Sequence, residues 1–504
     1  MATAEHTYRI VIVGGGTAGW MSAAALARFA PPGYTLTLVE SDAIGTVGVG
    51  EATIPGIRHF NEALDIDEAE FLRATKGSFK LGIEFCGWKA EGHSYMHAFG
   101  TVGRQLGVLP FRHFWARGRE LGLAKQLAYY SANEIAARAG RMDTNASGPG
   151  IAEVPYAYHF DAGLYAQFLR HYSEARGVTR LEGKIAGATR TADGDIAAVQ
   201  LDDGRSVAGD FFVDCSGFRG LLIEQELKTG YEDWSHWLPC NRAVAVPCEP
   251  TGNFTPYTRA TARRAGWQWR IPLQHRIGNG HVYCSDYISD DEASAVLLAN
   301  LDGQPLADPR VIEFTTGRRK AMWNRNVLAV GLSSGFMEPL ESTSIHLIQS
   351  AITRLLTVLP GRPIDPAIVA GFNRRAADEF ETIRDFLVLH YWANQRHGEP
   401  FWDRMRGIQL GETLRQRIAE FEGANQIQPR LDELFTEVAW LQVLVGQGLE
   451  PHRWNPIAER YPVAELKGFL DAVESAAIET VRPMPRHIDF LARLCAEPNA
   501  EVAA

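Results

Sequence analysis

Cysteine is scarce in this chain of 504 residues, and no two of its six cysteines stand at C-x-x-C spacing. Such scattered thiols indicate neither a zinc site nor a disulfide framework, so reduced cysteines and no bound metal are expected. The six positions are Cys86, Cys215, Cys240, Cys248, Cys284 and Cys495.

Long apolar runs and an excess of basic charge are also missing. No stretch of about 18 uncharged apolar residues occurs, and residues 1–6 resemble no signal peptide, which predicts a cytoplasmic protein without a membrane partner. The formal net charge is -10, and phosphate binding needs clustered Lys and Arg. A nucleic-acid partner is therefore not expected.

A glycine fingerprint is present near the N-terminus, between an expected strand at residues 8–13 and an expected helix at 17–29. The G-x-G-x-x-G pattern permits a tight turn, close approach of a pyrophosphate and close packing of helix on strand. Glu40 follows Gly19 by 21 residues, at the end of an expected strand 35–40, where its carboxylate can accept hydrogen bonds from a ribose. The residues of this predicted dinucleotide site are Gly14, Gly16, Thr17, Ala18, Gly19 and Glu40. On these residues alone, NAD and FAD both remain open.

The rest of the chain predicts an α/β fold, with a Rossmann-type (βαβ) domain that contains inserted β segments. Strand-like runs at 198–201, 210–213 and 327–330 indicate that the nucleotide domain is discontinuous. Helical patterns at 376–394, 412–421, 430–445 and 463–478 predict a mainly helical C-terminal region that covers the substrate. We expect two domains, 1–375 and 376–504.

A second motif narrows the function. The segment Gly266–Pro272 reads GWQWRIP, and together with the glycine fingerprint it resembles the flavin-dependent halogenases of the tryptophan halogenase family. The resemblance runs from about residue 7 to about residue 460 and implies FAD. Segments 210–220 and 326–332 resemble strands that end against a flavin, and 45–55 resembles the strap over its ring. Further cofactor contacts are expected at Gly50, Glu51, Ala52, Ile185, Asp214, Leu332 and Ile345.

The resemblance also implies the catalytic and halide residues. The segment 79–88 matches the one that carries the catalytic lysine, which is Lys80 here, although Lys76 is a nearby competitor. The segment 335–345 matches the one that supplies the catalytic glutamate, Glu341. The backbone N–H groups of Thr343 and Ser344 are expected to open a helix and hold the halide. Ser344 stands where better-known relatives have glycine, so chloride and bromide both remain open, and we hypothesise a bromide preference.

The substrate end departs further from the family. The segment 96–100 resembles the one that stacks on the substrate ring, so His97 and Phe99 are expected to bind substrate. Tryptophan halogenases use tyrosines and an acid from the helical region, but no tyrosine lies between Tyr391 and Tyr461. Indole or another electron-rich aromatic is therefore favoured over free tryptophan. The remaining expected contacts are Trp440, Glu450 and Trp454 for the substrate, and Trp267, Trp269, Ile271 and Pro272 for shielding the flavin.

The predicted activity is halogenation of an aromatic small molecule by reduced FAD (FADH2), O2 and chloride or bromide, through a flavin hydroperoxide and hypohalous acid. A separate NAD(P)H-dependent flavin reductase is the expected partner, and the assembly state, including a homodimer, stays open. Two alternatives remain: an FAD-dependent aromatic monooxygenase that hydroxylates without halide, and a non-catalytic flavin-binding protein.

Overall fold

The computed structural model describes residues 7–43, 50–252, 254–361, 363–430 and 433–496. Contacts divide the chain into two discontinuous units: residues 1–77, 160–241 and 313–381 form the first, and residues 78–159, 242–312 and 382–504 form the second. This division differs from the predicted domains 1–375 and 376–504, because segments 78–159 and 242–312 group with the C-terminal helices. The predicted boundary at residue 376 lies inside one helix, α9 (Pro366–Trp392).

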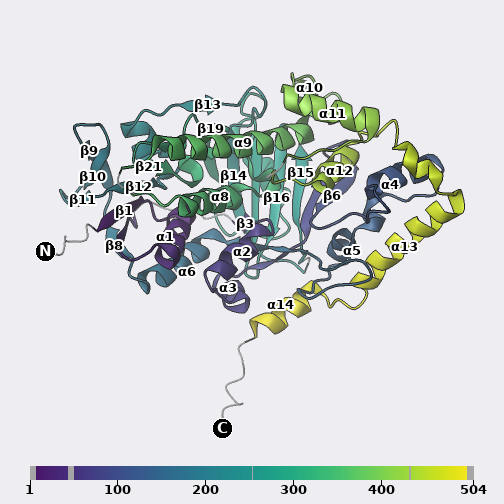
Figure 1. Ribbon diagram of the computed structural model, residues 1–504, viewed down its shortest axis with the longest axis horizontal. Helices are drawn as coiled ribbons and strands as arrows, with labels where there is room; N and C mark the ends of the chain where they lie inside the picture. Colours follow the sequence, from purple (N-terminus) through teal and green to yellow (C-terminus); the bar gives the residue numbers. More distant parts are fainter. Residues whose placement is uncertain (1–6, 44–49, 253, 362, 431–432, 497–504) are drawn as a thin grey trace, which may run out of the picture. The chain divides into compact units, whose positions relative to one another are not determined.

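The first unit is built on a six-stranded sheet in the order β20-β21-β12-β1-β2-β8, parallel except for β20 (Figure 1). Its strands are β1 (Tyr8–Val13), β2 (Tyr34–Glu40), β8 (Thr179–Glu182), β12 (Phe211–Asp214), β20 (Trp323–Asn324) and β21 (Val327–Ala329). Its helices are α1 (Thr17–Phe29), α2 (Gly56–Ala63), α3 (Glu68–Ala74), α6 (Ala162–Glu174), α8 (Ser344–Thr357) and the first part of α9. The predicted βαβ opening is therefore present.

One strand expected in the nucleotide-binding sheet lies elsewhere. The run predicted at 198–201 is part of β10 (Ile196–Leu201), which pairs with β9 (Ile185–Arg190) and β11 (Ser206–Ala208) in a separate antiparallel sheet. Its apolar side chains nevertheless pack on the parallel sheet, since Val199 and Leu201 share one buried cluster with Val11 and Phe212. The apolar pattern at 198–201 thus correctly predicted that these residues are buried, but it did not predict which strands they pair with. The short strands of this unit are β3 (Gly50–Ala52), β13 (Tyr231–Asp233), β19 (Gly317–Arg319) and β22 (Gly335–Phe336).

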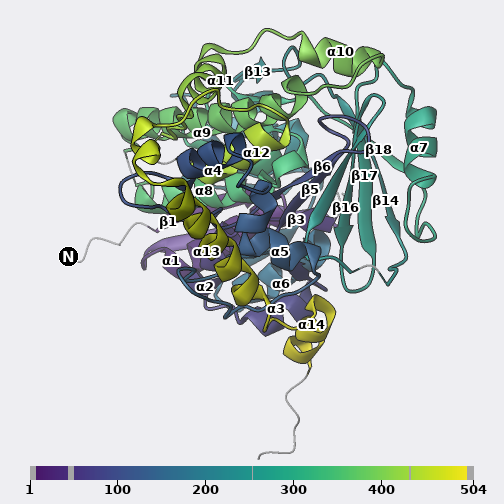
Figure 2. The ribbon, with the colours of Figure 1, turned by 90° about the vertical axis from the view of Figure 1, so that its right-hand side faces the viewer.

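The second unit contains a seven-stranded sheet in the order β18-β14-β17-β16-β15-β5-β6. Its strands are β5 (Gly82–Cys86), β6 (Ser94–Ala98), β14 (Arg242–Cys248), β15 (Thr258–Arg263), β16 (Gly266–Pro272), β17 (Ile277–Tyr283) and β18 (Arg310–Glu313). Figure 2 shows α7 (Asp290–Leu298) beside β14 and β17. A separate short strand, β4 (Ser78–Lys80), pairs antiparallel with β7 (Ala157–Asp161).

The other helices of the second unit are α4 (Phe111–Glu120), α5 (Ala132–Arg138), α10 (Pro400–Arg406), α11 (Glu412–Ala424), α12 (Glu437–Gly446), α13 (Val463–Val481) and α14 (His487–Cys495). The helix predicted at 430–445 begins later, because the side chain of Thr436 accepts a hydrogen bond from the Ala439 N–H and caps α12 there. The helix predicted at 376–394 begins earlier, at Pro366, where a proline is compatible with a first helical turn.

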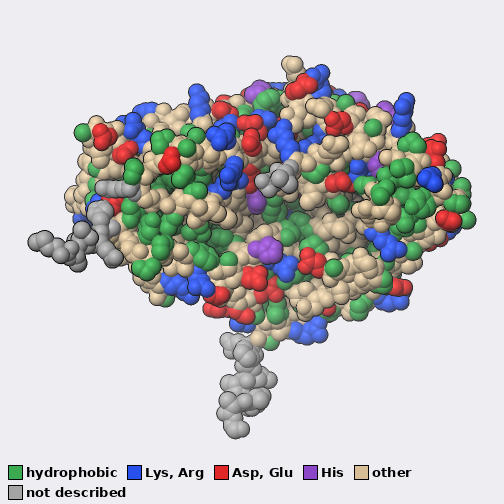
Figure 3. All heavy atoms as spheres, viewed as in Figure 1, with side chains coloured by type: hydrophobic (Ala, Val, Ile, Leu, Met, Phe, Trp, Pro, Cys, Tyr) green, Lys and Arg blue, Asp and Glu red, His purple; other side chains and the backbone are tan. Residues whose placement is uncertain are grey.

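Charged side chains of both signs are interspersed on the face that Figure 3 shows. None of the described helices combines the length and the apolarity that a bilayer crossing requires.

Candidate functional site

The glycine fingerprint joins β1 to α1 as the spacing predicts. Gly14 has φ +106°, and a Cβ added there would lie 2.4 Å from the carbonyl oxygen of Cys215, so only glycine fits. Gly16 caps α1 without a side-chain hydrogen bond, and the first turn carries no acidic residue. A Cβ on Gly16 would meet nothing within 4 Å. There is thus open space beside Gly16 at the uncapped start of α1, which suits the phosphates of a dinucleotide.

Glu40 ends β2 next to this turn. A Cβ on Gly15 would lie 1.4 Å from Oε2 of Glu40, so the carboxylate sits directly against the fingerprint backbone. Arg180 of β8 donates to Oε1 of Glu40 from Nε at 2.5 Å. Sequence reasoning missed Arg180, because only the parallel pairing of β8 with β2 brings it to Glu40.

The other predicted cofactor residues of the first unit lie in several elements. Gly331 precedes Leu332, and a Cβ added to Gly331 would lie 2.8 Å from the Cβ of Ala18, so this turn packs against the start of α1. Ile345 is buried in the first turn of α8, and Ile185 begins β9. Of the predicted strap, residues 44–49 lie outside the described residues. The rest includes β3, which holds Gly50, Glu51 and Ala52.

Two carboxyl groups in this set behave unlike surface acids. Asp214 is fully buried and accepts hydrogen bonds from the N–H groups of Leu222 at 2.8 Å and Ile223 at 2.9 Å. Its carboxylate therefore stabilises the turn after β12, and its predicted contact with the cofactor stays a prediction. Burial raises the pKa of Glu51 to about 7.

Glu341 lies in the short 3-10 turn Pro339–Glu341, directly before α8, and is 1% exposed. Ser342 then adopts left-handed backbone with φ +59° and ψ 37°, and α8 begins at Ser344, as predicted. Thr343 is the N-cap and makes no side-chain capping bond, and the first turn of α8 contains no acid. The N–H groups that open α8 are thus available to an anion.

Glu379 of α9 holds α8 in place. Its carboxylate accepts from His346 Nε2 at 2.9 Å, Ser350 Oγ at 2.7 Å and Arg354 Nη2 at 2.7 Å. These three donors occupy one face of α8 over two turns, so the helix that begins at Ser344 is fixed from its first turn. No local pattern in the sequence indicates the role of Glu379, because its partners lie on another helix.

Lys80 is the last residue of β4 in the second unit, and its side chain is 0% exposed. The alternation of apolar residues in segment 79–88 is typical of one strand, but the structure has two, β4 and β5. They separate at Leu81, whose N–H donates to the Pro256 carbonyl at 2.8 Å and leaves the ladder. The ammonium of Lys80 lies 5.3 Å from the ring centroid of Phe99. Lys76 is exposed and belongs to the first unit.

Of the predicted substrate residues in the second unit, His97 and Trp440 lie in one aromatic cluster around Phe386, whereas Glu450 does not. The rings of His97 and Phe386 have centroids 5.6 Å apart, and Trp440 packs edge-on against the same Phe386 ring at 4.8 Å. Phe435 stacks on Phe386 at 3.8 Å, a pair that no local pattern in the sequence indicates. Trp440 is 1% exposed and its indole N–H donates to Glu433, so its ring is a packed member of this cluster.

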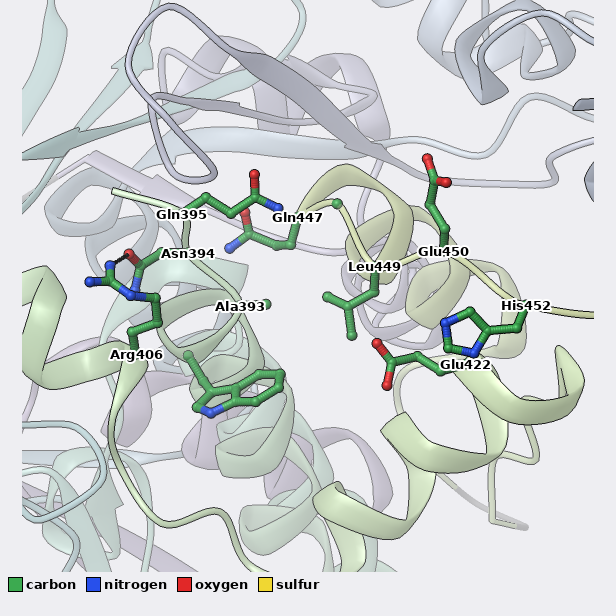
Figure 4. A pocket seen from close by; sticks show the side chains of 11 residues that line it. Ala393, Asn394, Gln395, Arg406, Glu422, Gln447, Leu449, Glu450 and His452 are labelled. Carbon is green, nitrogen blue, oxygen red and sulfur yellow. Dashed lines mark hydrogen bonds between the residues drawn. The ribbon is translucent and has the colours of Figure 1, made fainter. Parts of the chain in front are cut away.

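Glu450 lies apart from that cluster, at the exposed rim of a pocket of about 500 Å³. Figure 4 shows Glu450 on the same side as Glu422 and His452, with Arg406 on the other side. His97, Phe99 and Trp440 do not line this pocket. Trp454 is half-buried, and its indole N–H has no partner among the described residues.

The segment GWQWRIP forms β16, and all seven residues are buried. Trp267 and Trp269 lie on one face, with ring centroids 6.1 Å apart, as alternation along a strand requires. The Trp269 ring lies over Gly280 of the paired strand β17, where a Cβ would come within 2.0 Å of the indole. Ile271 and Pro272 continue the strand to its end.

Comparison with known proteins identifies the family. A family model described as tryptophan halogenase matches residues 9–463. The chain belongs to the tryptophan halogenase family. It is a flavin-dependent halogenase, and as such its chemistry depends on a flavin and a halide.

Several relatives match over nearly the whole chain. Tryptophan 6-halogenase SttH of Streptomyces toxytricini is 36% identical over 96% of this chain and 98% of its own length. Two solved structures are similar to this chain. Xcc4156, a flavin-dependent halogenase from Xanthomonas campestris, has a TM-score of 0.94, 46% identity and coverage of 98% of this chain and 99% of its own. BrvH, a flavin-dependent halogenase from Brevundimonas sp. BAL3, has a TM-score of 0.93, 42% identity and coverage of 98% and 100%.

Proposed function

We propose that this halogenase uses reduced FAD to install bromide or chloride on an electron-rich aromatic such as indole or an indole derivative. The observation that carries the proposal is the complete burial of Lys80 beside an aromatic ring, since lysine is almost never fully buried unless it has a specific role or partner. Together with its motif, this burial favours Lys80 over the exposed Lys76 as the catalytic lysine.

The first unit fits FAD. The uncapped start of α1 suits the pyrophosphate, and Glu40 against the fingerprint suits the adenosine ribose. Thr17, Ala18 and the turn that contains Leu332 meet at the carboxyl ends of the parallel strands, where ligands bind in open α/β sheets. When bound and reduced, the flavin would supply two electrons to O2, which takes two more from a halide ion, so that hypohalous acid and water form.

The opening of α8 is the proposed halide site. The N–H groups of Thr343 and Ser344 lie at a helix N-terminus, where the helix dipole favours an anion, and no acidic side chain of the first turn competes. The side chain of Ser344 adds a hydroxyl, which can donate a further hydrogen bond.

Hypohalous acid then halogenates the aromatic ring. The ring carbon attacks the halogen, the carbon–halogen bond forms, the oxygen–halogen bond breaks, and the oxygen leaves as water after taking a proton. Lys80 holds the oxidant by donating a hydrogen bond. Alternatively, its neutral amine takes the halogen from hypohalous acid with release of water, and the nitrogen–halogen bond of this haloamine breaks when the ring carbon attacks. Glu341 accepts the proton that the ring carbon loses. The apolar side chains of Trp267, Trp269, Ile271 and Pro272 exclude water near the flavin.

An aromatic without an amino-acid end is the favoured substrate. His97 and Phe99 are the proposed ring contacts. Trp440 packs in the core with its N–H occupied, and Glu450 lies in a separate exposed pocket. These positions support the inference that free tryptophan is not the native substrate, because they offer no clamp for its charged end.

The test is product mass from an indole panel that includes tryptophan, supplied with reduced FAD, O2 and either halide. We expect a mass shift of one halogen on indole-type compounds and less on tryptophan. A hydroxylated product without halide would establish the aromatic monooxygenase instead. FAD binding with neither product would indicate a non-catalytic flavin protein.

A separate flavin reductase is the proposed partner, because the only nicotinamide- or flavin-type fingerprint found is the one at Gly14. NADH and oxidised FAD should give no product in a preparation free of reductase, and addition of a flavin reductase should restore it. Turnover without the reductase would contradict this proposal.

A further inference from the structure

The strand that ends in Lys80 has histidines at both of its edges. Ser78 lies opposite His159 in the antiparallel pairing of β4 with β7, and the Ser78 hydroxyl is 3.1 Å from His159 Nδ1. On the other side, the backbone N–H of Phe79 donates to His487 Nε2 at 3.3 Å. The two residues before Lys80 are therefore each bound by an imidazole.

The hydrogen bonds of His159 allow one arrangement of its proton. Ser78 Oγ donates its single proton to the Pro272 carbonyl at 2.7 Å, so it must accept from His159 Nδ1. A neutral imidazole with its proton on Nδ1 has a bare Nε2, and this nitrogen accepts from Thr258 Oγ1 at 2.9 Å. The donors thus run in one direction, from Thr258 through His159 and Ser78 to Pro272.

His487 is fixed in the same tautomer by different partners. The Phe254 carbonyl can only accept, so His487 Nδ1 donates to it at 3.3 Å. The Phe79 N–H can only donate, so Nε2 must carry a lone pair. The imidazole also stacks on the Phe254 ring, with centroids 4.8 Å apart and planes 3° apart, which sets its orientation.

Neither ring can take up a second proton without breaking this arrangement. His159 is 0% exposed and His487 is 1% exposed. Burial lowers the pKa of His487 to about 4, and burial together with the charges of Lys80 and Arg270 lowers the pKa of His159 well below 6.5. A proton on either Nε2 would remove an acceptor, and on His159 it would also add positive charge near the Lys80 ammonium.

We propose that His159 and His487 are positioning residues for Lys80: two neutral imidazoles, each with its proton on Nδ1, fix the strand whose last residue is Lys80. The chain of hydrogen bonds through Ser78 also ties that strand to Pro272, the last residue of the proposed flavin-shielding strand. The inference rests on the proposed catalytic role of Lys80. Placement matters because a displacement of about 1 Å in a catalytic group can lower a rate by about a hundredfold.

The tautomers can be measured without any cofactor. Nitrogen-15 NMR of the histidine-labelled chain distinguishes a protonated Nδ1 from a protonated Nε2, and His159→Gln and His487→Gln assign the signals. We expect both rings to show a protonated Nδ1 and a bare Nε2 that persist from about pH 8 to about pH 5. The opposite tautomer in either ring, or titration near the ordinary histidine pKa, would overturn the proposal.

Two variants of Thr258 test whether the hydrogen bond to His159 affects halogenation. Thr258→Val keeps the side-chain shape but removes the donor to His159, whereas Thr258→Ser keeps that donor. Thr258→Val should lower kcat for halogenation about tenfold with the KM for the aromatic unchanged, and Thr258→Ser should restore most of it. Equal kcat in the Val and Ser variants would refute the positioning role.

His487→Phe tests the hydrogen bonds of His487 separately, because the variant keeps an aromatic ring stacked on Phe254 and loses only those hydrogen bonds. It should also lower kcat while FAD binding is unchanged, and unchanged kcat would exclude His487 from the proposal. If Lys80→Met retains halogenation, the catalytic role of Lys80 fails, and the tautomer measurement still reports on the two histidines by itself.

Discussion

The ammonium of Lys80 and the ring of Phe99 form a cation–π pair at 5.3 Å, and the Phe99 N–H donates to the carbonyl of Leu81, the residue after Lys80. One residue therefore contacts both the side chain of Lys80 and its adjacent backbone. Such a pair contributes about 1 kcal/mol at an exposed site and about 2 kcal/mol when the cation is desolvated, as the buried Lys80 is. Phe99 thus combines a predicted substrate contact with support for the lysine.

Phe99→Leu should lower halogenation about tenfold, because it removes the aromatic face that both Lys80 and the proposed substrate ring contact. Phe99→Tyr keeps that face and serves as the control, with activity within a few-fold of the unchanged chain. The measurement is product formed per reduced flavin supplied. If the Leu variant matched the Tyr variant, Phe99 would have no aromatic role.

Ser344→Gly should shift halide use towards chloride. Bromide is larger, less strongly hydrated and more easily oxidised than chloride, and the Ser344 hydroxymethyl group changes the opening of α8. A competition assay at equal bromide and chloride concentrations gives the product ratio directly. Mainly chlorinated product from the unchanged chain, with the same ratio for Ser344→Gly, would remove both the preference and its proposed cause.

Glu51→Gln should stabilise the flavin-free chain at pH 8 but not at pH 4. Burial raises the folded-state pKa of Glu51 to about 7, while an unfolded glutamate titrates near 4.3. The contribution of Glu51 to stability is thus fully present below about pH 4.3 and is lost as the pH rises through 7. Denaturant unfolding at both pH values measures it. Glu62→Gln, with a side chain 82% exposed, should change neither value.

Acid should destabilise the fold through its buried histidines. Burial lowers the pKa values of His281 and His487 to about 4, while unfolded histidines titrate near 6.5. Between about pH 4 and pH 6.5 the unfolded chain binds more protons than the folded chain. The free energy of unfolding is therefore at its full value above about pH 6.5 and decreases towards pH 4. Each histidine adds a slope of at most about 1.4 kcal/mol per pH unit.

His281→Gln should make this slope shallower, and the exposed His59→Gln should leave it unchanged. The measurement is the denaturant midpoint and slope between pH 4 and 7. An identical pH dependence for His281→Gln and the unchanged chain would show that His281 is protonated equally in both states.

Local patterns predicted the elements that carry the fingerprint. β1 and α1 begin and end where the sequence indicates, because an apolar run, a glycine turn and a run of small residues follow one another without interruption. The start of α8 at Ser344 agrees with what the family resemblance implies for Thr343 and Ser344. Strand pairing was not predictable: the apolar run at 198–201 is buried, but only the complete fold decides which sheet it joins.

The supports of Lys80 show what a sequence conceals. Its motif identified Lys80, whereas His159 and His487 lie 81 and 408 residues from their partners in β4, and no spacing connects them. Trp440 is expected to contact the substrate because no tyrosine lies between Tyr391 and Tyr461, and in the structure its ring packs edge-on against Phe386. Residue type indicates what a side chain can do, and packing decides what remains accessible.

The most direct test of the account is a single turnover of Lys80→Met with reduced FAD, O2, bromide and indole. Methionine retains an unbranched stem of similar length and removes the ammonium. The exposed Lys76→Ala is the control and should form product normally. Mass spectrometry measures brominated indole, and flavin absorbance measures reoxidation in the same sample. We expect the product to fall by about a hundredfold or more while reoxidation stays nearly unchanged. Undiminished product from Lys80→Met would contradict the account.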